Sequence, residues 1–239
     1  METRFAQSDS LWNLSMPAKF DAYAKDYETL HANSITASGE QPGYFSDYKV
    51  DCLARLAGSN FDEPVLDYGC GVGTLTHRLC TRYSRVYGFD PSTKSLDEAR
   101  QHGDSATYHD DPGELPQAHF GIVVLANVLH HVPPPNRVEL LTRLSELLRP
   151  GTGRLVVFEH NPYNPLTRRA VAQCEFDDDA ILLGPGELVG LLGQCGYKAV
   201  RRRFIVFFPR LMAVLRPLEP SLGWLPVGAQ MMAFGTSPG

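Results

Sequence analysis

Three glycines alternate in the segment VLDYGCGVG, which spans residues 65–73, and Asp67 stands just before them. Apolar residues precede these glycines and a helical pattern follows them, so the segment is typical of a strand, a tight turn and a helix. Glycines in such a turn let the backbone approach a ligand closely, and the helix behind it offers free N–H groups. Asp90 ends the next expected strand, about 20 residues after Gly69, where an acid can bind ribose hydroxyls. The turn and the acid together predict a nucleotide-binding site.

Two details of the turn bear on the kind of nucleotide. The dinucleotide pattern GxGxxG would need its third glycine at Thr74, whereas the alternation here ends at Gly73. The carboxylate of Asp67 would repel a pyrophosphate, but it suits a sulfonium or an amino group. The turn therefore favours a cationic nucleoside with an aminoacyl group over NAD. A tight turn that binds no ligand is the structural alternative.

A second set of candidate residues lies in the segment FEHNPYNP, where a strand expected over 153–158 ends. Its two prolines restrict the loop, and ligands of open α/β sheets bind beyond the carboxyl ends of the strands. His160 can take a proton from a hydroxyl, an amine or a carbon acid, and Glu159 can orient His160 or bind a cationic substrate. A structural loop, in which the two asparagines cap turns, is the competing interpretation.

The adjacent histidines His130 and His131 follow another expected strand, over 119–126. Neighbouring side chains point in different directions in most backbone conformations, so one ring can face the ligand cleft. His131 is therefore a further candidate for a general base, because an imidazole titrates near neutral pH. The alternative is that this pair packs under the ligand or hydrogen-bonds to the backbone.

Strands and helices alternate from residue 64 onward and must position these candidates. Strands are expected over 64–68, 85–89, 106–108, 119–126, 153–158, 198–208 and 229–236, and helices over 74–83, 92–101, 135–148 and 187–194. This alternation predicts an α/β fold with a parallel, doubly wound sheet. Residues 1–50 are expected to form a helical cap or lid, with a loop over 31–45, and residues 51–239 the main domain. A helix that starts in the cap is expected to stop at Gly58.

The composition narrows the possible partners and the compartment. The chain has 239 residues, 43% hydrophobic residues and a net charge of −5, so one core is expected and nucleic acid is disfavoured as a partner. The first 20 residues lack the apolar core of a secretion signal, and the apolar run 204–208 is too short to cross a bilayer. The five cysteines form no CxxC pair, which predicts a reduced, cytoplasmic protein without a zinc site. The acidic run 175–179 is interpreted as a solvated loop, and no metal is expected there.

Four segments together resemble the class I S-adenosylmethionine-dependent methyltransferases. They are VLDYGCGVG, VYGFDPSTKSLDEA, HFGIVVLANVLHHV and LRPGTGRLVVFEHNP, in the order and spacing of that family. The resemblance covers roughly residues 45 to 236. It implies a Rossmann-like, seven-stranded, mostly parallel sheet with helices on both faces, in which the last strand lies antiparallel beside the fifth.

The resemblance also implies which residues bind S-adenosylmethionine. The three glycines of the turn would line its methionine and ribose part, Asp67 would support the turn and the amino group, and Asp90 would bind both ribose hydroxyls. Asp111 would lie near the adenine amine. Apart from the resemblance, the aromatic residues of the cap are expected to supply a contact from Tyr27 or Tyr44, because a tyrosine face can hold a sulfonium by cation–π attraction. The alternative is that these rings bury the inner face of the cap helix. The complete set of expected cofactor contacts is Asp67, Gly69, Cys70, Gly71, Gly73, Asp90, Pro91, Asp111, Asn127, Val128, Tyr27 and Tyr44.

The expected activity is methyl transfer from S-adenosylmethionine to an O, N or C atom of a small molecule, such as a secondary metabolite or a biosynthetic intermediate. The alternatives are methylation of tRNA or protein, and binding of the cofactor without methyl transfer. A monomer or a homodimer is expected, without stable membrane insertion. The apolar segment 204–228 follows the arginines 201–203 and contains Arg210 and Arg216. Three roles stay open for it: a wall over a greasy substrate, a contact with a membrane, or a dimer face.

Overall fold

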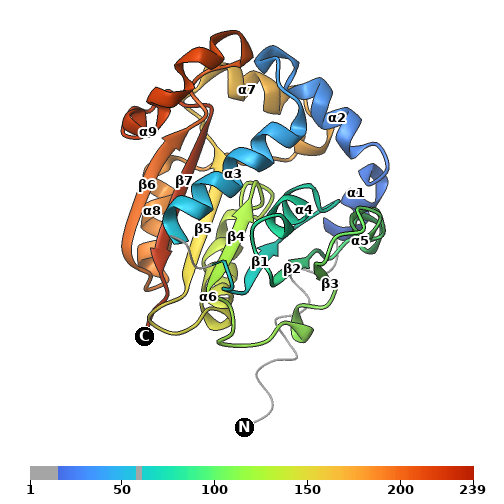
Figure 1. Cartoon of the computed structure of the whole chain (residues 1–239), viewed down its shortest axis with the longest axis vertical. Coiled ribbons are helices and arrows are strands. Elements are labelled where there is room, and N and C mark those ends of the chain that lie inside the picture. Colours follow the sequence, from blue (N-terminus) through green and yellow to red (C-terminus); the bar gives the residue numbers. More distant parts are fainter. Residues whose placement is uncertain (1–15, 58–60) are drawn as a thin grey trace.

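The computed structural model describes residues 16–57 and 61–239, which fold around one seven-stranded sheet (Figure 1). The strands follow the order β3-β2-β1-β4-β5-β7-β6. They are β1 Val65–Tyr68, β2 Val86–Phe89, β3 Thr107–His109, β4 Ile122–Ala126, β5 Arg154–His160, β6 Lys198–Ile205 and β7 Gln230–Thr236. Six strands are parallel to one another, and β7 lies antiparallel between β5 and β6. The predicted Rossmann-like sheet with an antiparallel last strand is confirmed.

The central strands are buried on both faces, as their uninterrupted apolar sequences predict. All four residues of β1 are buried, and so are the first four of β4. The strand expected over 119–126 begins only at Ile122, because the backbone N–H groups of His119 and Phe120 donate to the carbonyl of Leu147 at the end of α6. β1 and β4 are therefore buried neighbours in the middle of the sheet, and their carboxyl ends lie next to each other.

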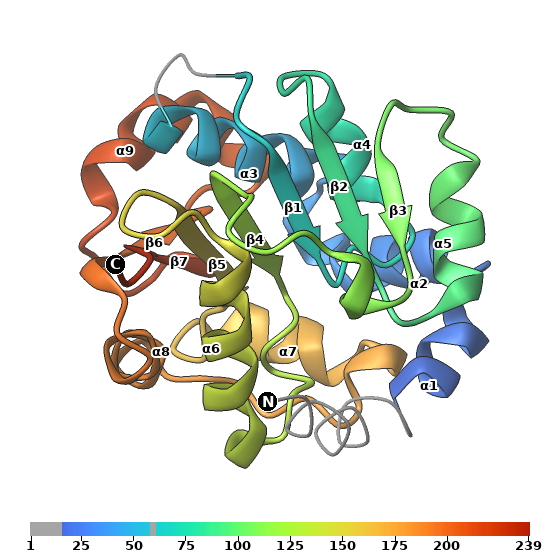
Figure 2. The ribbon, with the colours of Figure 1, turned by 90° about the horizontal axis from the view of Figure 1, so that it is seen from below.

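Helices cover both faces of the sheet (Figure 2). On one side lie α3, Pro42–Ala57, and α4, Thr74–Cys80, whose apolar residues pack against one half of the core. On the other side lie α6, Arg137–Leu147, and α8, Pro185–Gln194. Between β2 and β3 runs α5, Thr93–Arg100, and short 3-10 turns η2 and η3 span Pro112–Glu114 and Pro134–Asn136.

The N-terminal cap is more helical than its sequence predicted. Helix α1 spans Met16–Tyr23, α2 spans Tyr27–Ser34, the 3-10 turn η1 spans Thr36–Ser38, and α3 starts at Pro42. The loop expected over 31–45 is therefore wrong at both ends, because its polar residues continue α2 and Pro42 occupies the first turn of α3, where a proline is well tolerated. Helix α3 runs without a break through residue 50, and the division of the chain at that position stays a prediction. Residues 1–15 and Gly58 lie outside the described residues.

The remaining elements gather at the carboxyl end of the parallel strands, at the top of Figure 1. They are α7 Pro165–Ala172, η4 Glu175–Asp177, η5 Arg210–Leu218 and α9 Glu219–Leu222. The strand expected to reach residue 208 ends at Ile205, because the backbone N–H groups of Phe207 and Phe208 donate to the buried carboxylate of Glu219 instead of to a neighbouring strand. Within the described chain, no helix has the length and apolar character needed to cross a bilayer.

Candidate functional site

A cavity lies beyond the carboxyl ends of β1, β2, β4 and β5, where ligands of open α/β sheets bind. The glycine turn forms its floor, and helices α1, α2 and α3 of the cap form one wall. Helix α7 and the turn η4 also contribute residues to the lining. The topology thus brings the cap, the turn after β1 and the loops after β4 and β5 around one space.

The glycine turn has the backbone conformation that its sequence predicted. Gly69, Gly71 and Gly73 have φ angles of 79°, 52° and 78°, in the left-handed region that other residues rarely adopt. A Cβ at Gly69 would lie 2.7 Å from the side chain of Val128, whereas a Cβ at Gly71 would meet no atom within 4 Å. Gly71 therefore faces open space in the cavity, where a ligand can approach the backbone. Gly73 lies outside the lining and begins α4 as its N-cap.

Most of the other residues expected to bind the cofactor also line the cavity. Those in the lining are Asp67, Gly69, Cys70, Gly71, Asp90, Pro91, Asn127, Val128 and Tyr27. They come from four separate segments of the chain. Besides Gly73, two expected residues lie outside the lining, Asp111 and Tyr44.

Asp90 is held in place by backbone donors. Its Oδ2 accepts the N–H of Gly71 at 2.8 Å, and its Oδ1 accepts the N–H of Ser92 at 2.9 Å. Burial raises the pKa of Asp90 to about 6, although these two hydrogen bonds act in the opposite direction. The carboxylate is therefore fixed at the end of β2 beside the glycine turn, with lone pairs left for a ligand's hydroxyl groups.

Asp67 and Asn127 lie at the ends of the two central strands. The buried carboxylate of Asp67 accepts a hydrogen bond from Thr76 Oγ1 at 2.7 Å, and burial raises its pKa to about 6. Asn127 has a φ of 60°, which is uncommon for a residue other than glycine. Its Oδ1 is buried and has no hydrogen-bond partner among the described residues. Such strain and an unused acceptor are typical of a ligand-binding position.

The tyrosines of the cap differ in their placement. Tyr27 lines the cavity, and its ring stacks on Phe176 with 4.8 Å between the centroids. The ring of Tyr44 instead lies under the guanidinium of Arg216, at 4.3 Å, away from the cavity lining. Of the two tyrosines expected to contact the cofactor, Tyr27 thus lines the cavity and Tyr44 does not.

Asp111 is exposed, and its Oδ1 accepts the N–H of Gly113 at 2.8 Å. It caps the short turn η2, because an aspartate readily accepts a hydrogen bond from the backbone two residues later. The structure does not bring Asp111 into the cavity lining.

Lys49 is a cavity residue that the sequence analysis missed. It projects from α3, is buried, and is the lone Lys or Arg among the described residues of the lining. Burial lowers its pKa to about 8, while the nearby carboxylates of Asp67 and Glu159 oppose this shift. It makes no ion pair within residues 16–57 and 61–239, so its charge is available to a ligand. In the sequence it occupies an ordinary helical position, which gave no signal of this role.

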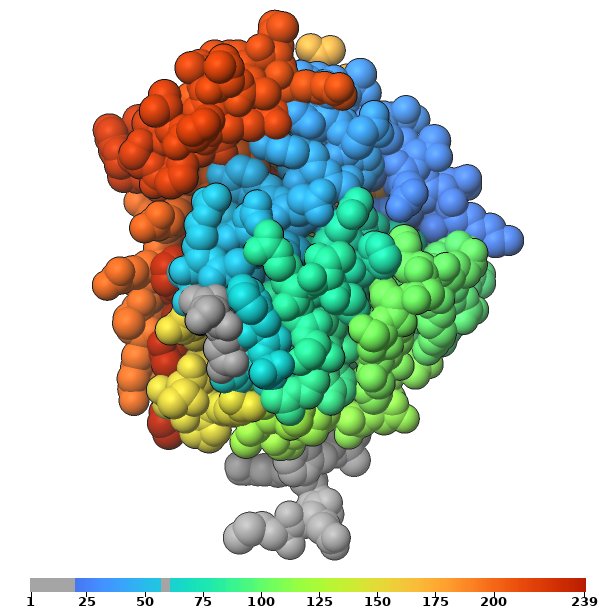
Figure 3. Space-filling view, in the orientation of Figure 1, coloured from blue at the N-terminus to red at the C-terminus, as the bar shows by residue number. Residues whose placement is uncertain are grey.

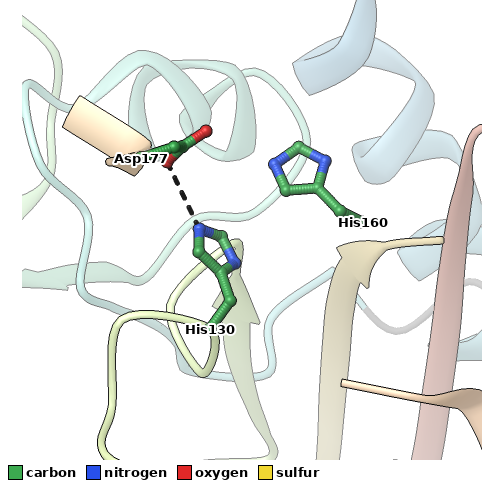
Figure 4. Close-up of side chains that lie close together, drawn as sticks. All are labelled: His130, His160 and Asp177. Carbon is green, nitrogen blue, oxygen red and sulfur yellow. Dashed lines mark ion pairs between the residues drawn. The ribbon is translucent and has the colours of Figure 1, made fainter. Parts of the chain in front are cut away.

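A cluster of histidines and acids occupies the cavity wall beyond Asn127 (Figure 4). The Nδ1 of His130 lies 2.6 Å from Oε2 of Glu159, and its Nε2 lies 3.5 Å from Oδ1 of Asp177. Burial disfavours a charge on His130, but the carboxylates of Glu159 and Asp177 outweigh it and raise the pKa of His130 to about 9. Burial likewise opposes ionisation of these two acids, and the charged histidine lowers the pKa of both. His130 is therefore an imidazolium between two carboxylates.

The expected catalytic residues occupy different places in this cluster. His160 and His131 line the cavity, whereas Glu159 lies behind His130 and is absent from the lining. Glu159 thus orients His130, not His160 as one interpretation of the sequence held; its other oxygen accepts the N–H of Leu129 at 2.8 Å. Burial and the charge of His130 lower the pKa of His160 to about 4, so its ring is neutral at pH 7.

Asp177 corrects the interpretation of the acidic run 175–179. Glu175, Asp178 and Asp179 are exposed, as a solvated loop predicts, but Asp177 is buried and lines the cavity. Together with His130 and His160 it could hold a metal ion, since one ligand atom from each lies within 4.8 Å of the others. Asp177 is already ion-paired with His130, and its Oδ1 also lies 3.3 Å from the Nε2 of His131.

The loop after β5 is largely structural. The buried amide of Asn161 donates to the carbonyls of Pro226 and Gly228, and Asn164 caps α7 by accepting the N–H groups of Leu166 and Thr167. The capping interpretation of these asparagines is therefore confirmed, and His160 is the residue of this loop that reaches the cavity.

The arrangement combines two chemical environments in one space. The half near the glycine turn offers carboxylates, one lysine and an open backbone approach. The half near His160 offers a neutral imidazole beside a charged one. Such a site can hold a zwitterionic nucleoside in one half and present a proton acceptor to a second molecule in the other.

Parts of the chain are similar in sequence to known proteins. Residues 65–151 match the model of a family described as a methyltransferase domain. Over 142 residues the chain is 29% identical to the ubiquinone biosynthesis O-methyltransferase of Pseudoalteromonas translucida, a match that covers 56% of this chain and 57% of that protein. The chain therefore aligns with little more than half the length of this relative.

Two solved structures share the fold. A protein of Thermotoga maritima, described as a SAM-dependent methyltransferase and possible histamine N-methyltransferase, superposes with a TM-score of 0.66 at 18% identity, over 93% of this chain and 99% of that one. The magnesium protoporphyrin IX methyltransferase of Synechocystis, with bound S-adenosylhomocysteine, superposes with a TM-score of 0.63 at 18% identity, over 92% and 96% of the two chains. At these identities the likeness concerns the fold.

Proposed function

Because this chain belongs to the class I S-adenosylmethionine-dependent methyltransferase family, we propose that it transfers a methyl group from S-adenosylmethionine to an O, N or C atom of a small molecule. The observation that carries this proposal is the cavity itself, in which the glycine turn and the histidine cluster face a common space. A site with only one of these halves would support binding, whereas the two together support transfer between two bound molecules.

The residues near the glycine turn suit each polar part of the cofactor. Asp90 would accept hydrogen bonds from both ribose hydroxyls, and the open face at Gly71 would let the nucleoside lie against the backbone. Asp67 and the free acceptor of Asn127 suit the amino group of the methionine part. Lys49 suits its carboxylate, because it is the one lysine or arginine in the described lining and makes no ion pair with another described residue. The chemistry of the donor set therefore fits the cofactor.

When bound, S-adenosylmethionine supplies a methyl group on a sulfonium, which needs no further activation. The protein's contribution is then to exclude water, align the acceptor and remove its proton. The stacked rings of Tyr27 and Phe176 lie where they can shield the cavity, and the face of Tyr27 can attract a sulfonium.

His160 is our candidate for the proton acceptor. Its neutral ring lines the cavity, whereas His130 is already protonated and Asp177 is ion-paired. An acceptor hydroxyl or amine would pass its proton to a ring nitrogen of His160 as the new bond to carbon forms. His131 is the alternative base, and Glu159 is a positioning residue that acts through His130.

The acceptor is proposed to be a biosynthetic intermediate. The relative is named for ubiquinone biosynthesis, and the similar structure is named for magnesium protoporphyrin IX. Both names refer to small molecules. The net charge of −5 argues against nucleic acid as the substrate. We further propose a cytoplasmic protein, because its five cysteines are unpaired, that acts as a monomer or a homodimer.

Calorimetry with S-adenosylhomocysteine tests the cofactor half of this proposal, and mass analysis of candidate metabolites for the gain of one methylene tests the acceptor half. We expect binding and a methylated small-molecule product. An absence of binding at millimolar ligand would contradict the proposal. Binding with methylation of only tRNA or protein, in a strongly salt-dependent manner, would favour the macromolecular alternative.

A further inference from the structure

Exposed apolar side chains gather on one face of the molecule. Of the nine large hydrophobic residues with high exposure in the described chain, all except Ile181 belong to the start of α7 or to the segment 211–227. We call these eight residues the apolar patch: Tyr163, Leu166, Leu211, Met212, Val214, Leu218, Trp224 and Val227. Leu211 is 96% exposed, Val214 86% and Trp224 74%. Single exposed apolar residues are ordinary on a protein surface, whereas a concentration of this kind marks an interaction site.

The two segments that carry the apolar patch are joined to each other. Asn164 at the start of α7 donates to the carbonyl of Val227 at 2.8 Å, and Asn161 donates to the carbonyls of Pro226 and Gly228. In Figure 3 the segment that contains η5 and α9 forms the orange-red surface at the upper left. The start of α7 and the end of segment 211–227 therefore lie next to each other.

The charge of this surface is positive, in contrast to the rest of the chain. Segments 161–172 and 207–228 contain four arginines and one acid, Glu219. Glu219 is buried, and its carboxylate accepts the backbone N–H of Phe207, just after β6. Arg168, Arg169 and Arg210 are exposed, while Arg216 pairs with Glu40. The chain as a whole has a net charge of −5. Apolar tips with arginines among them are typical of a surface that meets anionic lipid.

A second copy of this chain fits the surface poorly. In a two-fold dimer the same patch would face itself, so the exposed arginines of one copy would approach those of the other. These segments offer no exposed acid to pair with them. An anionic bilayer supplies negative charge together with an apolar interior, and it therefore satisfies both features.

The apolar patch also borders the cavity. Tyr163 lies in the turn just before α7 and Leu166 in its first turn, while its last turn carries Ala170 and Val171, which line the cavity. At the other side, Arg210 at the start of η5 lies against Gly39, where a Cβ would be 3.2 Å from the arginine's Cβ. Gly39 follows η1 in the cap, and the nearby Ile35 is a cavity residue.

We propose that the apolar patch docks this protein peripherally on an anionic phospholipid surface, with η5, α9 and the start of α7 against the headgroups. This docking goes beyond the proposed methyl transfer, and it accounts for the apolar segment 204–228 whose role the sequence left open. Because docking places the cavity wall at the bilayer, the acceptor class it suits is an amphiphile delivered from the membrane.

The test measures vesicle binding directly, so its outcome does not depend on methyl transfer. A Trp12→Phe variant leaves Trp224 as the sole tryptophan, since the sequence has two; Trp12 lies outside the described residues. This variant is mixed with vesicles of phosphatidylcholine alone, or of phosphatidylcholine with phosphatidylglycerol. With the anionic vesicles we expect co-sedimentation, a blue shift of Trp224 emission and quenching by brominated acyl chains. Added salt should weaken the binding.

The double variant Leu211→Glu/Val214→Glu should bind these vesicles at least about tenfold more weakly, because it replaces apolar contacts with charges of the wrong sign. Its matched control is Ile181→Glu, which alters an exposed apolar residue outside the apolar patch and should bind as the parent does. Both changes are at exposed positions, and thermal unfolding checks that the fold is intact. Unchanged Trp224 emission with both vesicle types, or equal binding by the double variant, would overturn the proposal. A parent dimer that the double variant converts to a monomer, without vesicle binding, would assign the face to a second copy instead.

Discussion

His130 and Glu159 form a buried pair, with 2.6 Å between the histidine's Nδ1 and the carboxylate's Oε2. Both side chains are about 1% exposed, and they come from the loop after β4 and from the end of β5. A carboxylate buried without a partner is strongly disfavoured. The pair therefore holds the loop after β4 against the end of β5 at the cavity wall. Burial lowers the pKa of the neighbouring His160, and the charge of His130 adds to this shift.

The pair makes stability depend on pH in a definite direction. The pKa of His130 is about 9 in the folded protein and about 6.5 when unfolded, so its contribution is complete below pH 6.5 and is lost as the pH rises through 9. The free energy of unfolding should therefore fall between pH 6.5 and 9 by up to about 3 kcal/mol more in the parent than in His130→Gln. Urea unfolding at both pH values measures this. The comparison cancels the opposite trend from Lys49, which both proteins share.

If His130→Gln does not fold, the pKa of His130 can be measured by NMR titration of its ring in the parent protein. The imidazole resonances of His130 in the parent protein should remain those of the protonated ring at pH 8. A midpoint near 6.5 would contradict the assignment of His130 as an imidazolium between two carboxylates.

Removal of the proposed base should reduce turnover and spare cofactor binding. His160→Ala is expected to lower kcat by about 10²–10⁴-fold with an unchanged affinity for S-adenosylhomocysteine, because the ring faces the acceptor half of the cavity. Single-turnover kinetics and calorimetry measure the two quantities. His131→Ala is the matched variant and should have a smaller effect. If both variants keep the full rate, the enzyme works by positioning alone.

Lys49 is expected to bind the carboxylate of the cofactor. Lys49→Met should weaken S-adenosylhomocysteine binding by roughly 10–150-fold, the range of a lost charge-assisted hydrogen bond. The affinity of the parent should also fall as the pH rises above about 8, where the buried amine loses its proton. Lys198→Met is the control, since Lys198 is exposed at the start of β6. An unchanged affinity in Lys49→Met would refute this role.

Asp90 and Asp111 were both expected to bind the cofactor, but only Asp90 lines the cavity. Asp90→Ala should weaken cofactor binding by about 1.5–3 kcal/mol for each ribose hydrogen bond lost. Asp111→Ala should have little effect, because that side chain is exposed and caps η2. Calorimetry compares the two, and a thermal melt shows whether the loss of the Asp90 bonds to Gly71 and Ser92 also destabilises the turn. Equal losses in both variants would mean that Asp111 reaches the adenine.

The histidine cluster is expected to work without a metal ion. Asp177 is already ion-paired with His130, and its Oδ1 also lies 3.3 Å from the Nε2 of His131. Prolonged treatment with a chelator should therefore leave the methyl-transfer rate unchanged. A loss of rate that zinc or magnesium restores would instead assign a metal to His130, His160 and Asp177, whose ligand atoms lie within 4.8 Å of one another.

The sequence by itself determined the sheet and the cofactor half of the site. Alternating apolar strands and amphipathic helices predicted the order of the elements, because each pattern depends on neighbours along the chain. The glycine turn and Asp90 were readable for the same reason, since a φ that only glycine adopts easily and an acid at a strand end are local features. Strand boundaries at residues 119 and 208 were wrong, because distant partners, Leu147 and Glu219, take the backbone N–H groups.

Only the tertiary structure decided the other half of the cavity and the place of Lys49 in the cofactor half. Asp177 and Lys49 occupy an acidic run and an ordinary helix in the sequence, and their importance arises from burial beside residues far along the chain. The pairing of Glu159 with His130 instead of His160 likewise depends on how two loops meet at the end of the sheet. Burial and charge at such a meeting point set the pKa values, so no local pattern could reveal that His130 is charged and His160 neutral. The same holds for the apolar patch, because the exposure of Leu211 and Trp224 is decided by what the folded chain leaves uncovered.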